Sequence, residues 1–328
     1  MSGTFTWHGG RLAAARAQFG DGPHPWLDLS TGINPIAWPG AVMIAPDWGS
    51  LPDPEDLRAL EQAAALHFGV DPANVCAVPG SELGLRLLGA LFDLPARHLT
   101  PSYRTHAEIF PGSRAIPAPK GPLPQATMLV LANPNNPDGR VLSPETLRRW
   151  LVWQGEAGGW LVVDEAFADG APQISMAPHV ADDRCLIVMR SFGKFFGLAG
   201  VRLGFLIGPR SVIVRLRRLL GDWPLSAAAI AIGRAAYGDG AWIAAAREAL
   251  ACRAGALDAL LRNHGLAAAG DCPLFRLIEH DDAHGIFTLL ARQQVLTRPF
   301  DDHPRWLRFG LPAGPEELER IDRALRHG

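Results

Sequence analysis

A single lysine in a glycine-rich apolar loop constrains this sequence more than any other feature. The loop reads Ser191-Phe192-Gly193-Lys194 and directly follows an apolar, strand-like run over residues 186–189. Only one other lysine, Lys120, occurs among the 31 lysine and arginine residues. An amine in apolar surroundings has a lowered pKa, and its neutral form can make a Schiff base with a carbonyl group. We therefore interpret Lys194 as a candidate nucleophile; the alternative is a surface lysine that happens to follow a strand.

The bulk composition excludes several classes of protein. A length of 328 residues suggests two domains, or one large domain with an appendage. With 33 acidic and 31 basic residues and a net charge of −2, the chain lacks the clustered basic excess that nucleic-acid binding requires. No apolar run approaches the roughly 18 residues of a membrane span, and the first residues do not form a signal peptide pattern. We therefore expect no nucleic-acid partner, no membrane partner and no secretion.

The cysteines give no sign of a disulfide framework or of a zinc site. They are scattered along the chain, at Cys76, Cys185, Cys252 and Cys272. The absence of a CxxC pair favours free thiols in a reducing cytoplasm. The stretch His280-Asp281-Asp282-Ala283-His284 contains metal-binding side chains, but such polar residues between two elements usually form a plain loop. We expect a cytoplasmic protein without a metal.

Strand-like and helix-like segments alternate from residue 75 onward. Short apolar runs predict seven strands, over residues 75–78, 98–100, 115–117, 127–131, 159–163, 185–189 and 203–207. Helices are expected over residues 83–91 and 144–153, the second with Ser143 as its N-cap. This order predicts an α/β fold in which a mostly parallel, seven-stranded sheet lies between helices. Ligands of such sheets bind at the carboxyl ends of the strands.

The pattern changes near residue 210. Two long helices, over residues 212–220 and 241–263, precede a smaller α/β arrangement with strands over residues 275–279, 295–297 and 306–310. We therefore predict three parts. Residues 1–40 form an N-terminal segment that packs with the small domain, residues 41–210 form the large ligand-binding domain, and residues 211–328 form the small α/β domain with its linking helices.

Five polar motifs stand at the ends of the predicted strands. In chain order they are Pro79-Gly80-Ser81-Glu82, Pro101-Ser102-Tyr103-Arg104-Thr105-His106, Asn133-Pro134-Asn135-Asn136-Pro137-Asp138-Gly139, Asp164-Glu165-Ala166-Phe167, and Ser191-Phe192-Gly193-Lys194 with Arg202. They offer an anion cradle at a helix start, an aromatic ring, an amide, a carboxylate and a lysine. Pyridoxal 5′-phosphate needs such a set, since it has a phosphate, an aromatic face, a phenolic oxygen, a ring nitrogen and an aldehyde.

In order and spacing these motifs resemble the fold type I pyridoxal-phosphate enzymes of the aspartate aminotransferase family, over roughly residues 30–312. The resemblance implies that Lys194 forms the Schiff base, that Asp164 is the partner of the pyridine nitrogen and that Asn136 donates to the phenolic oxygen. It also implies that Tyr103 stacks on the ring and that His106 supports the aspartate. The implied phosphate cup consists of Gly80, Ser81, Glu82, Ser191 and Arg202.

The resemblance further implies a homodimer with its active site near the interface, but two positions depart from the family pattern. Phe167 stands where most aminotransferases have a tyrosine that contacts the phenolic oxygen, so this hydrogen bond is absent here. Leu51 stands where many relatives have a tyrosine that reaches the cofactor phosphate of the partner subunit.

Several segments resemble the branch of this family that decarboxylates L-threonine O-3-phosphate in cobalamin biosynthesis. They are His8-Gly9-Gly10, residues 27–35, the Asp164 motif with Phe167, Trp223-Pro224-Leu225-Ser226 and Leu296-Thr297-Arg298. By this resemblance the substrate, a small phosphorylated amino acid, is bound by His8, Gly9, Asn34, Asn136, Arg298 and Arg308. Arginine suits these anions because its planar guanidinium binds carboxylate and phosphate with two parallel hydrogen bonds.

The sequence also permits two other interpretations. One is a histidinol-phosphate aminotransferase, whose substrate also carries a phosphate. The other is a protein that binds pyridoxal 5′-phosphate without turnover, although every expected catalytic position is filled. Bond cleavage at the α-carbon depends on which bond stands perpendicular to the cofactor ring, and the motifs do not report that geometry.

Overall fold

A seven-stranded sheet forms the centre of the larger of two units in the computed structural model, which describes residues 4–326. This unit, called unit 2, comprises Ala37–Asn136 and Val141–Ala245. Unit 1 comprises the described residues up to Ile36, the short segment Pro137–Arg140 and the described residues from Ala246 onward. Among residues 4–326, no helix has both the length and the apolar character needed to cross a membrane.

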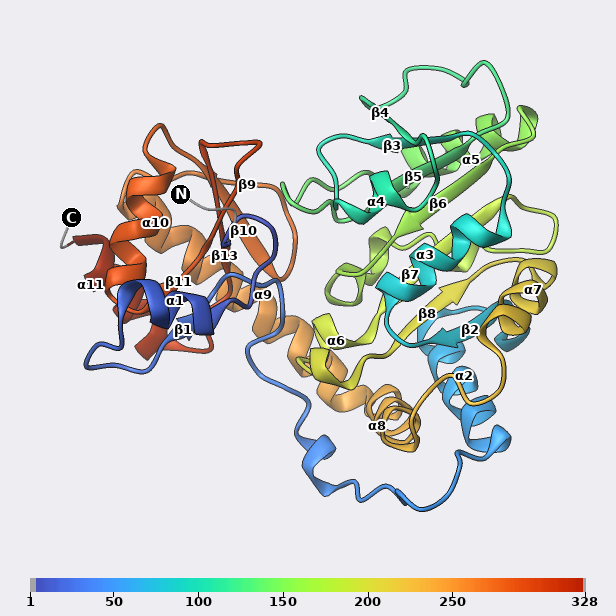
Figure 1. The fold of residues 1–328 in the computed structure, drawn as a ribbon, viewed down its shortest axis with the longest axis horizontal. Coiled ribbons are helices and arrows are strands. Elements are labelled where there is room, and N and C mark those ends of the chain that lie inside the picture. The colour runs from blue at the N-terminus through green and yellow to red at the C-terminus, as the bar shows by residue number, and fades with distance from the viewer. Residues whose placement is uncertain (1–3, 327–328) are drawn as a thin grey trace. The chain divides into compact units, whose positions relative to one another are not determined.

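The sheet of unit 2 has the strand order β2-β8-β7-β6-β5-β3-β4 (Figure 1). Its strands are β2 (Val75–Val78), β3 (Ala96–Leu99), β4 (Arg114–Ile116), β5 (Met128–Ala132), β6 (Trp160–Asp164), β7 (Leu186–Ser191) and β8 (Gly204–Ile207). Only β8 runs antiparallel to its neighbours; the other adjacent pairs are parallel. Every residue of β5 and β7 is buried, as expected for parallel strands covered on both faces. The predicted α/β fold with a mostly parallel seven-stranded sheet is confirmed.

The helices of unit 2 pack on this sheet. They are α2 (Pro54–Phe68), α3 (Ser81–Leu91), α4 (Thr105–Glu108), α5 (Pro144–Glu156), α6 (Phe192–Phe195), α7 (Arg210–Leu220), α8 (Ala227–Gly238) and the first turns of α9 (Gly240–Asn263). Short 3₁₀ turns occur at η1 (Pro39–Met43), η2 (Pro72–Asn74), η3 (Ala168–Gly170), η4 (Pro172–Ile174), η5 (Ala177–His179) and η6 (Ala199–Val201). Ser143 caps α5 as predicted, because its hydroxyl accepts the N–H of Thr146. The alanine-rich α8 was not predicted.

Apolar burial explains why α7 belongs to this unit. Leu216 and Ile213 of α7 pack in one cluster with Leu88 of α3 and with Val162 and Ile187 of the sheet. The change of pattern near residue 210 predicts that α7 and α8 belong to the small domain, whereas both helices lie in unit 2 with the large sheet.

Unit 1 contains two small sheets. The antiparallel sheet has the order β12 (Arg298–Pro299), β13 (Trp306–Gly310), β10 (Phe275–Glu279) and β9 (Ala268–Ala269), and β1 (Leu27–Asp28) pairs in parallel with β11 (Val295–Leu296). Helices α1 (Leu12–Phe19), α10 (Ala283–Arg292), α11 (Pro315–Arg326) and the rest of α9 complete the unit. The strand predicted over residues 295–297 is present as β11, one residue shorter, and Arg298 then begins the unpredicted strand β12 in the other sheet.

A buried ion network joins the ends of β6 and β7. The guanidinium of Arg190, in β7, binds Glu165 at 2.8 Å between Nη1 and Oε2, and it also binds Asp169. Asp169 accepts a second contact from His67 of α2 at 3.0 Å. Burial tends to raise the pKa of Asp169, but the charge of Arg190 and the contact with His67 lower it to about 2. Glu165 and Asp169 are fully buried, so their charges depend on Arg190.

The first prediction follows from this dependence. Replacing Arg190 with Met should lower the free energy of unfolding by about 3–5 kcal/mol, because two buried carboxylates lose their cation. Urea denaturation followed by circular dichroism would measure the change. Arg234→Met is a matched control, since Arg234 pairs with Asp56 at 3.0 Å on the surface, where both side chains are more than half exposed. A cost for Arg190→Met no larger than the control's would contradict the prediction.

Candidate active site

The candidate nucleophile and the candidate ring-nitrogen partner lie at the same edge of the sheet. Asp164 is the last residue of β6, and Lys194 lies in α6, which begins directly after β7. The register pairs Asp164 with Ala132, the last residue of β5, and with Met189 of β7, which continues two residues farther to Ser191. Lys194 is half-buried, and its Nζ lies 6.0 Å from the ring centre of Phe167. Lys120 is exposed in the loop before β5.

Asp164 is held in place by two neighbours. Its Oδ2 lies 3.2 Å from Nε2 of His106, and its Oδ1 accepts the N–H of Ala166 at 3.1 Å. His106 is completely buried and Asp164 nearly so. The other ring nitrogen of His106, Nδ1, is also buried and has no hydrogen-bond partner among the described residues. A carboxylate held in this way has a fixed direction and suits a protonated ring nitrogen.

Tyr103 is fixed by the side chain of Glu82. Its hydroxyl donates to Oε2 of Glu82 at 2.9 Å, and Thr105 and Arg86 donate to the same carboxylate. Burial tends to raise the pKa of Glu82, but these hydrogen bonds outweigh it and the pKa is lowered. Burial and the charge of Glu82 raise the pKa of Tyr103 to about 12. Tyr103 therefore stays protonated at neutral pH, with an aromatic ring of fixed orientation.

The start of α3 forms an anion cradle. Gly80 precedes the helix with a φ of 85°, and no side chain caps the first N–H groups. A Cβ atom on Gly80 would lie 2.8 Å from Nη2 of Arg202, and a Cβ on Gly204 would lie 2.4 Å from the backbone nitrogen of Ser81. The buried Ser191 opposes Gly204 in the β7–β8 ladder. Helix N–H groups beside a guanidinium, with glycines where a side chain would intrude, fit a phosphate.

The asparagines after β5 have different partners. Asn133 exchanges hydrogen bonds with the backbone of Leu142, at 3.1 and 2.8 Å, and Asn135 donates to the carbonyl of Pro101 at 2.9 Å. These contacts shape the loop. Asn136, which directly follows them at the end of this segment of unit 2, remains the candidate donor to a phenolic oxygen.

Two candidate substrate residues face each other in unit 1. Arg298 of β12 and Arg308 of β13 are direct partners in the antiparallel register, and both are more than nine-tenths buried. Burial, together with the charge of Arg298, lowers the pKa of Arg308 well below its usual value. Like charges placed opposite each other on neighbouring strands repel. Two buried guanidinium groups in this position therefore favour an anion.

The remaining candidates of unit 1 come from the N-terminal segment. The carbonyl of Trp7 accepts Nη2 of Arg298 at 3.1 Å, and the exposed His8 follows it. Gly9 packs against the backbone of Ser30, where a Cβ atom would lie 2.3 Å from the carbonyl oxygen. Asn34 is buried, and its Oδ1 accepts the N–H of Ile36 at 3.0 Å. The N-terminal turn thus lies beside both arginine strands.

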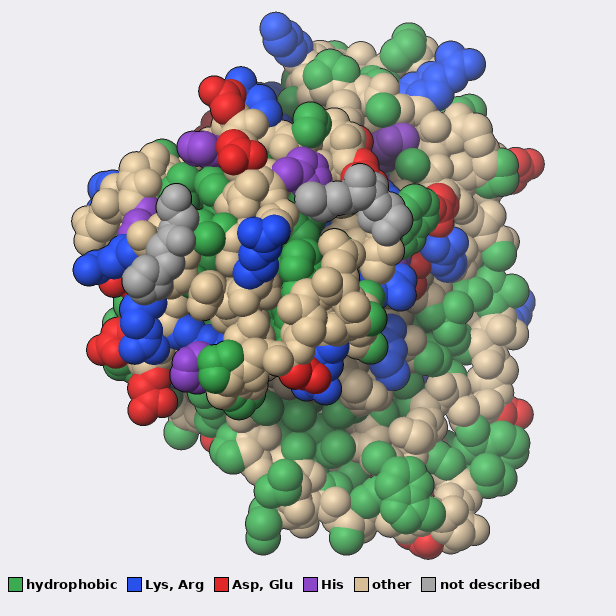
Figure 2. Space-filling view, turned by 60° about the vertical axis from the view of Figure 1, so that its left-hand side comes forward, with side chains coloured by type: hydrophobic (Ala, Val, Ile, Leu, Met, Phe, Trp, Pro, Cys, Tyr) green, Lys and Arg blue, Asp and Glu red, His purple; other side chains and the backbone are tan. Residues whose placement is uncertain are grey.

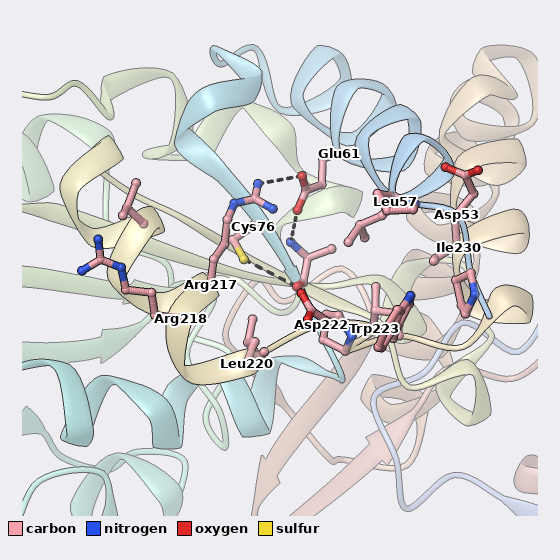
Figure 3. Close-up of a pocket in the computed structure, with 17 residues that line it drawn as sticks. Asp53, Leu57, Glu61, Cys76, Arg217, Arg218, Leu220, Asp222, Trp223 and Ile230 are labelled. Atoms are coloured by element: carbon pink, nitrogen blue, oxygen red, sulfur yellow. Dashed lines mark hydrogen bonds and ion pairs between the residues drawn. The ribbon is translucent and has the colours of Figure 1, made fainter.

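A separate cavity of about 580 Å³ opens elsewhere in unit 2 (Figure 3). Apolar side chains such as Leu57 and Trp223 line it, and none of the predicted site residues does. At its base Arg217 and Glu61 point toward each other at 2.7 Å, and Glu61 also accepts the N–H of Ala77. Because these charges already satisfy each other, the cavity gives no indication of a ligand class.

Some residues around the site were missed in the sequence. They are Thr105, Glu165, Asp169 and Arg190 in unit 2, and Asp28 and Ser30 in unit 1. Arg190 carried a usable signal, since an arginine at the end of an apolar strand-like run indicates a buried ion pair. The others look like ordinary loop or turn residues. Among residues 4–326, no three His, Cys, Asp or Glu side chains are grouped so that they could hold a metal ion.

Comparison with known proteins places these features in a family. The family model described as aminotransferase class I and II matches residues 42–327. The threonine-phosphate decarboxylase of a Sinorhizobium species is 40% identical to this chain, and the match covers 97% of each protein. The threonine-phosphate decarboxylase of Pseudomonas aeruginosa is 37% identical, and the match covers 97% of this chain and 96% of that protein. The solved structure of histidinol-phosphate aminotransferase from Sinorhizobium meliloti, in complex with pyridoxal 5′-phosphate, has a TM-score of 0.81 at 20% identity and covers 96% of this chain and 94% of its own.

The anion cradle generates the second prediction. Gly80→Ala should raise the Kd for pyridoxal 5′-phosphate by at least about tenfold, equivalent to ~1.4 kcal/mol, because the new methyl group displaces Arg202. Titration of the apoprotein, followed by absorbance of the bound cofactor, would measure it. Gly112→Ala controls for backbone strain: its φ is 72°, but nothing lies within 4 Å of the added Cβ. Equal affinities of the two variants would refute the cradle.

Proposed function

The chain belongs to the class I and II aminotransferase family, and on this premise we propose that it is a pyridoxal 5′-phosphate-dependent decarboxylase. Its proposed substrate is L-threonine O-3-phosphate and its product (R)-1-amino-2-propanol O-2-phosphate, a step of cobalamin biosynthesis. The two relatives named threonine-phosphate decarboxylase, which match nearly the whole chain, support this activity. The observation that carries the proposal is the pair of buried arginines, Arg298 and Arg308, in direct register.

The residues at the carboxyl edge of the large sheet fit the cofactor. Bound pyridoxal 5′-phosphate supplies an aldehyde that captures amines and a protonated pyridine ring that withdraws electrons from the bonds at the substrate α-carbon. Asp164, held by His106, would keep the ring nitrogen protonated. The cradle at Gly80 with Arg202 would hold the phosphate, and Tyr103 would stack on the ring.

The residues of unit 1 fit a substrate with two anionic groups. L-threonine O-3-phosphate carries a carboxylate and a phosphate, and each can accept parallel hydrogen bonds from one guanidinium. Arg298 and Arg308 provide two such groups in a buried, apolar setting beside Phe300 and Phe275, where charge-assisted hydrogen bonds gain strength. We assign His8, Gly9, Asn34 and Asn136 to the same substrate.

Lys194 would handle the proton that the reaction consumes. Decarboxylation breaks the bond between the α-carbon and the carboxylate carbon, releases CO2 and adds one proton to the α-carbon. The amine of Lys194 is the group we assign to deliver this proton, because it stands half-buried in α6 at the same edge of the sheet as Asp164.

A histidinol-phosphate aminotransferase is the alternative, supported by a relative of that name from Sodalis glossinidius that is 29% identical over 73% of this chain. Its substrate would place only a phosphate on the arginine pair, and its second substrate, a keto acid, would place a carboxylate there. The two reactions differ in their products: only the decarboxylase releases CO2 without a keto acid.

We also propose that the enzyme is a cytoplasmic homodimer. Four large apolar side chains of one continuous segment are exposed in the single chain: Val42 by 88%, Met43 by 83%, Trp48 by 76% and Leu51 by 68%. Figure 2 shows hydrophobic side chains gathered in the lower part of the face that it draws. A contiguous apolar patch of this kind is typical of a protein interface.

The third prediction tests the reaction. The purified protein with pyridoxal 5′-phosphate and L-threonine O-3-phosphate should release CO2 over many turnovers without a keto acid. Lys194→Ala should abolish this release, whereas Lys120→Ala, which removes the other lysine from an exposed loop, should leave it unchanged. Release of no CO2, with histidinol phosphate and 2-oxoglutarate reacting instead, would favour the aminotransferase.

The fourth prediction tests the assembly. Trp48→Glu combined with Met43→Glu should convert the dimer into monomers, because charged carboxylates would be buried without partners at the interface. Light scattering after gel filtration would measure the mass. Leu66→Glu is the control, since Leu66 is 85% exposed on α2, outside this segment. A wild-type protein that is monomeric at micromolar concentration would contradict the proposal.

A further inference from the structure

Ser30 connects the N-terminal turn of unit 1 to Arg308, although neither the sequence pattern nor the proposed reaction gives it a role. Its hydroxyl accepts the N–H of Gly10 at 2.7 Å and donates to Oδ1 of Asp28 at 2.5 Å. Its own N–H donates to the same oxygen at 2.9 Å. Its carbonyl accepts Nη2 of Arg308 at 3.1 Å. All three polar groups of one buried residue are thus used.

The hydroxyl can adopt only one arrangement here. A serine hydroxyl has one proton to donate, and Asp28 can only accept when ionised. The proton therefore points to Asp28, and the oxygen lone pairs face Gly10. The hydrogen bond from Gly10 to this oxygen therefore fixes the position of residues 8–10 relative to Ser30.

Gly9 reinforces the same connection from the other side. A Cβ atom there would lie 2.3 Å from the carbonyl oxygen of Ser30 and 2.8 Å from its carbonyl carbon. That oxygen is the one that binds Arg308. The position of the N-terminal turn and the direction of the Arg308 guanidinium are therefore set by one peptide group.

The segment around Ser30 also contacts β13, which carries Arg308, and β11, which ends shortly before Arg298. Leu29 donates its N–H to Leu296 of β11 at 2.8 Å, two residues before Arg298. Its carbonyl accepts the N–H of Gly310 of β13 at 2.6 Å, two residues after Arg308. A displacement of Ser30 would therefore act directly on β13, which carries Arg308, and on β11, two residues before Arg298.

We propose that Ser30 is a positioning residue for substrate: its hydroxyl anchors the N-terminal turn through Gly10 and Asp28, and its carbonyl sets the direction of Arg308. This inference rests on the proposed function, because it assumes that Arg308 binds a substrate anion. Ser30 contacts no reacting atom, so its loss weakens binding and leaves the chemistry of Lys194 in unit 2 intact. Glycine at position 9 is required for the same reason.

The test measures substrate binding and catalysis separately. Ser30→Ala should raise the KM for L-threonine O-3-phosphate by about threefold to tenfold, the usual effect of one lost hydrogen bond, with kcat within about twofold of wild type. Gly9→Ala should act in the same direction and more strongly, because the methyl group pushes directly on the carbonyl. Calorimetric titration of L-threonine O-3-phosphate into Lys194→Ala protein with and without Ser30→Ala should show the same loss of affinity without any turnover.

Two controls separate positioning from general damage. Asp28→Asn keeps an oxygen acceptor for both donors of Ser30 and should bind substrate nearly as wild type does. Gly155→Ala adds a methyl group where nothing lies within 4 Å and should change nothing. The absorbance of bound cofactor and its Kd should stay unchanged in Ser30→Ala, Gly9→Ala, Asp28→Asn and Gly155→Ala, since none of these positions belongs to the proposed cofactor site in unit 2.

Several outcomes would overturn the inference. Unchanged substrate affinity in Ser30→Ala, in a wild-type enzyme that does release CO2 from L-threonine O-3-phosphate, would refute the role of Ser30 alone. A parallel loss of kcat, cofactor affinity and thermal stability would mean a merely structural role. If Ser30→Ala does not fold, an unchanged KM in Gly9→Ala would decide against the proposal. A wild-type protein that neither binds nor converts the substrate would remove the proposed function, and this inference with it.

Discussion

The ion pairs of Arg190 are the interaction on which the candidate active site depends. Arg190 is separated from Lys194 by three residues, and its partner Glu165 directly follows Asp164. One guanidinium therefore ties the strand that presents the amine to the strand that presents the carboxylate. Glu165 also accepts the hydroxyl of Ser175 and the N–H of Met176, so this corner of the sheet is fixed by charge and hydrogen bonds at once. Removing one partner of a buried ion pair is costly, because the remaining charge is stabilised neither by water nor by an opposite charge.

Unit 1, which carries the two buried arginines, has a different electrostatic arrangement. Arg298 and Arg308 carry like charges opposite each other in a buried sheet, and the backbone carbonyls of Trp7 and Ser30 each accept one of their N–H groups. Because like charges in register repel, an anion bound to both guanidinium groups would be stabilised there. In unit 2, the buried carboxylate of Asp164 is held by His106 and suits a cationic ring nitrogen. Each unit therefore presents side chains whose charge is opposite to that of a proposed ligand group.

The sequence predicts the position of site residues that stand close to the ends of strands. Lys194, Asp164 and Gly80 lie at or shortly after the ends of apolar runs, so the strand pattern predicts that they share one edge of the sheet. The sequence does not predict contacts between residues that are far apart in the chain, or helices without a polar face. Asp169 and His67 come together from positions 102 residues apart, and no local pattern reports such a meeting. The alanine-rich α8 lacks a polar face to mark its period. Residues 295–299 belong to two different sheets, with Thr297 between the two strands. The hydrophobic pattern does not show that one strand ends and another begins there.

The scarcity of lysine has a practical consequence for handling the protein. Lys120 is exposed, while Lys194 is half-buried in α6. A surface chemistry that couples to side-chain amines therefore has one accessible target among the lysines. Immobilised through Lys120, molecules would share a single orientation, and the attachment point would lie in the loop before β5 rather than at the amine that we assign to catalysis. This selectivity arises because arginine fills every other Lys/Arg position of the chain.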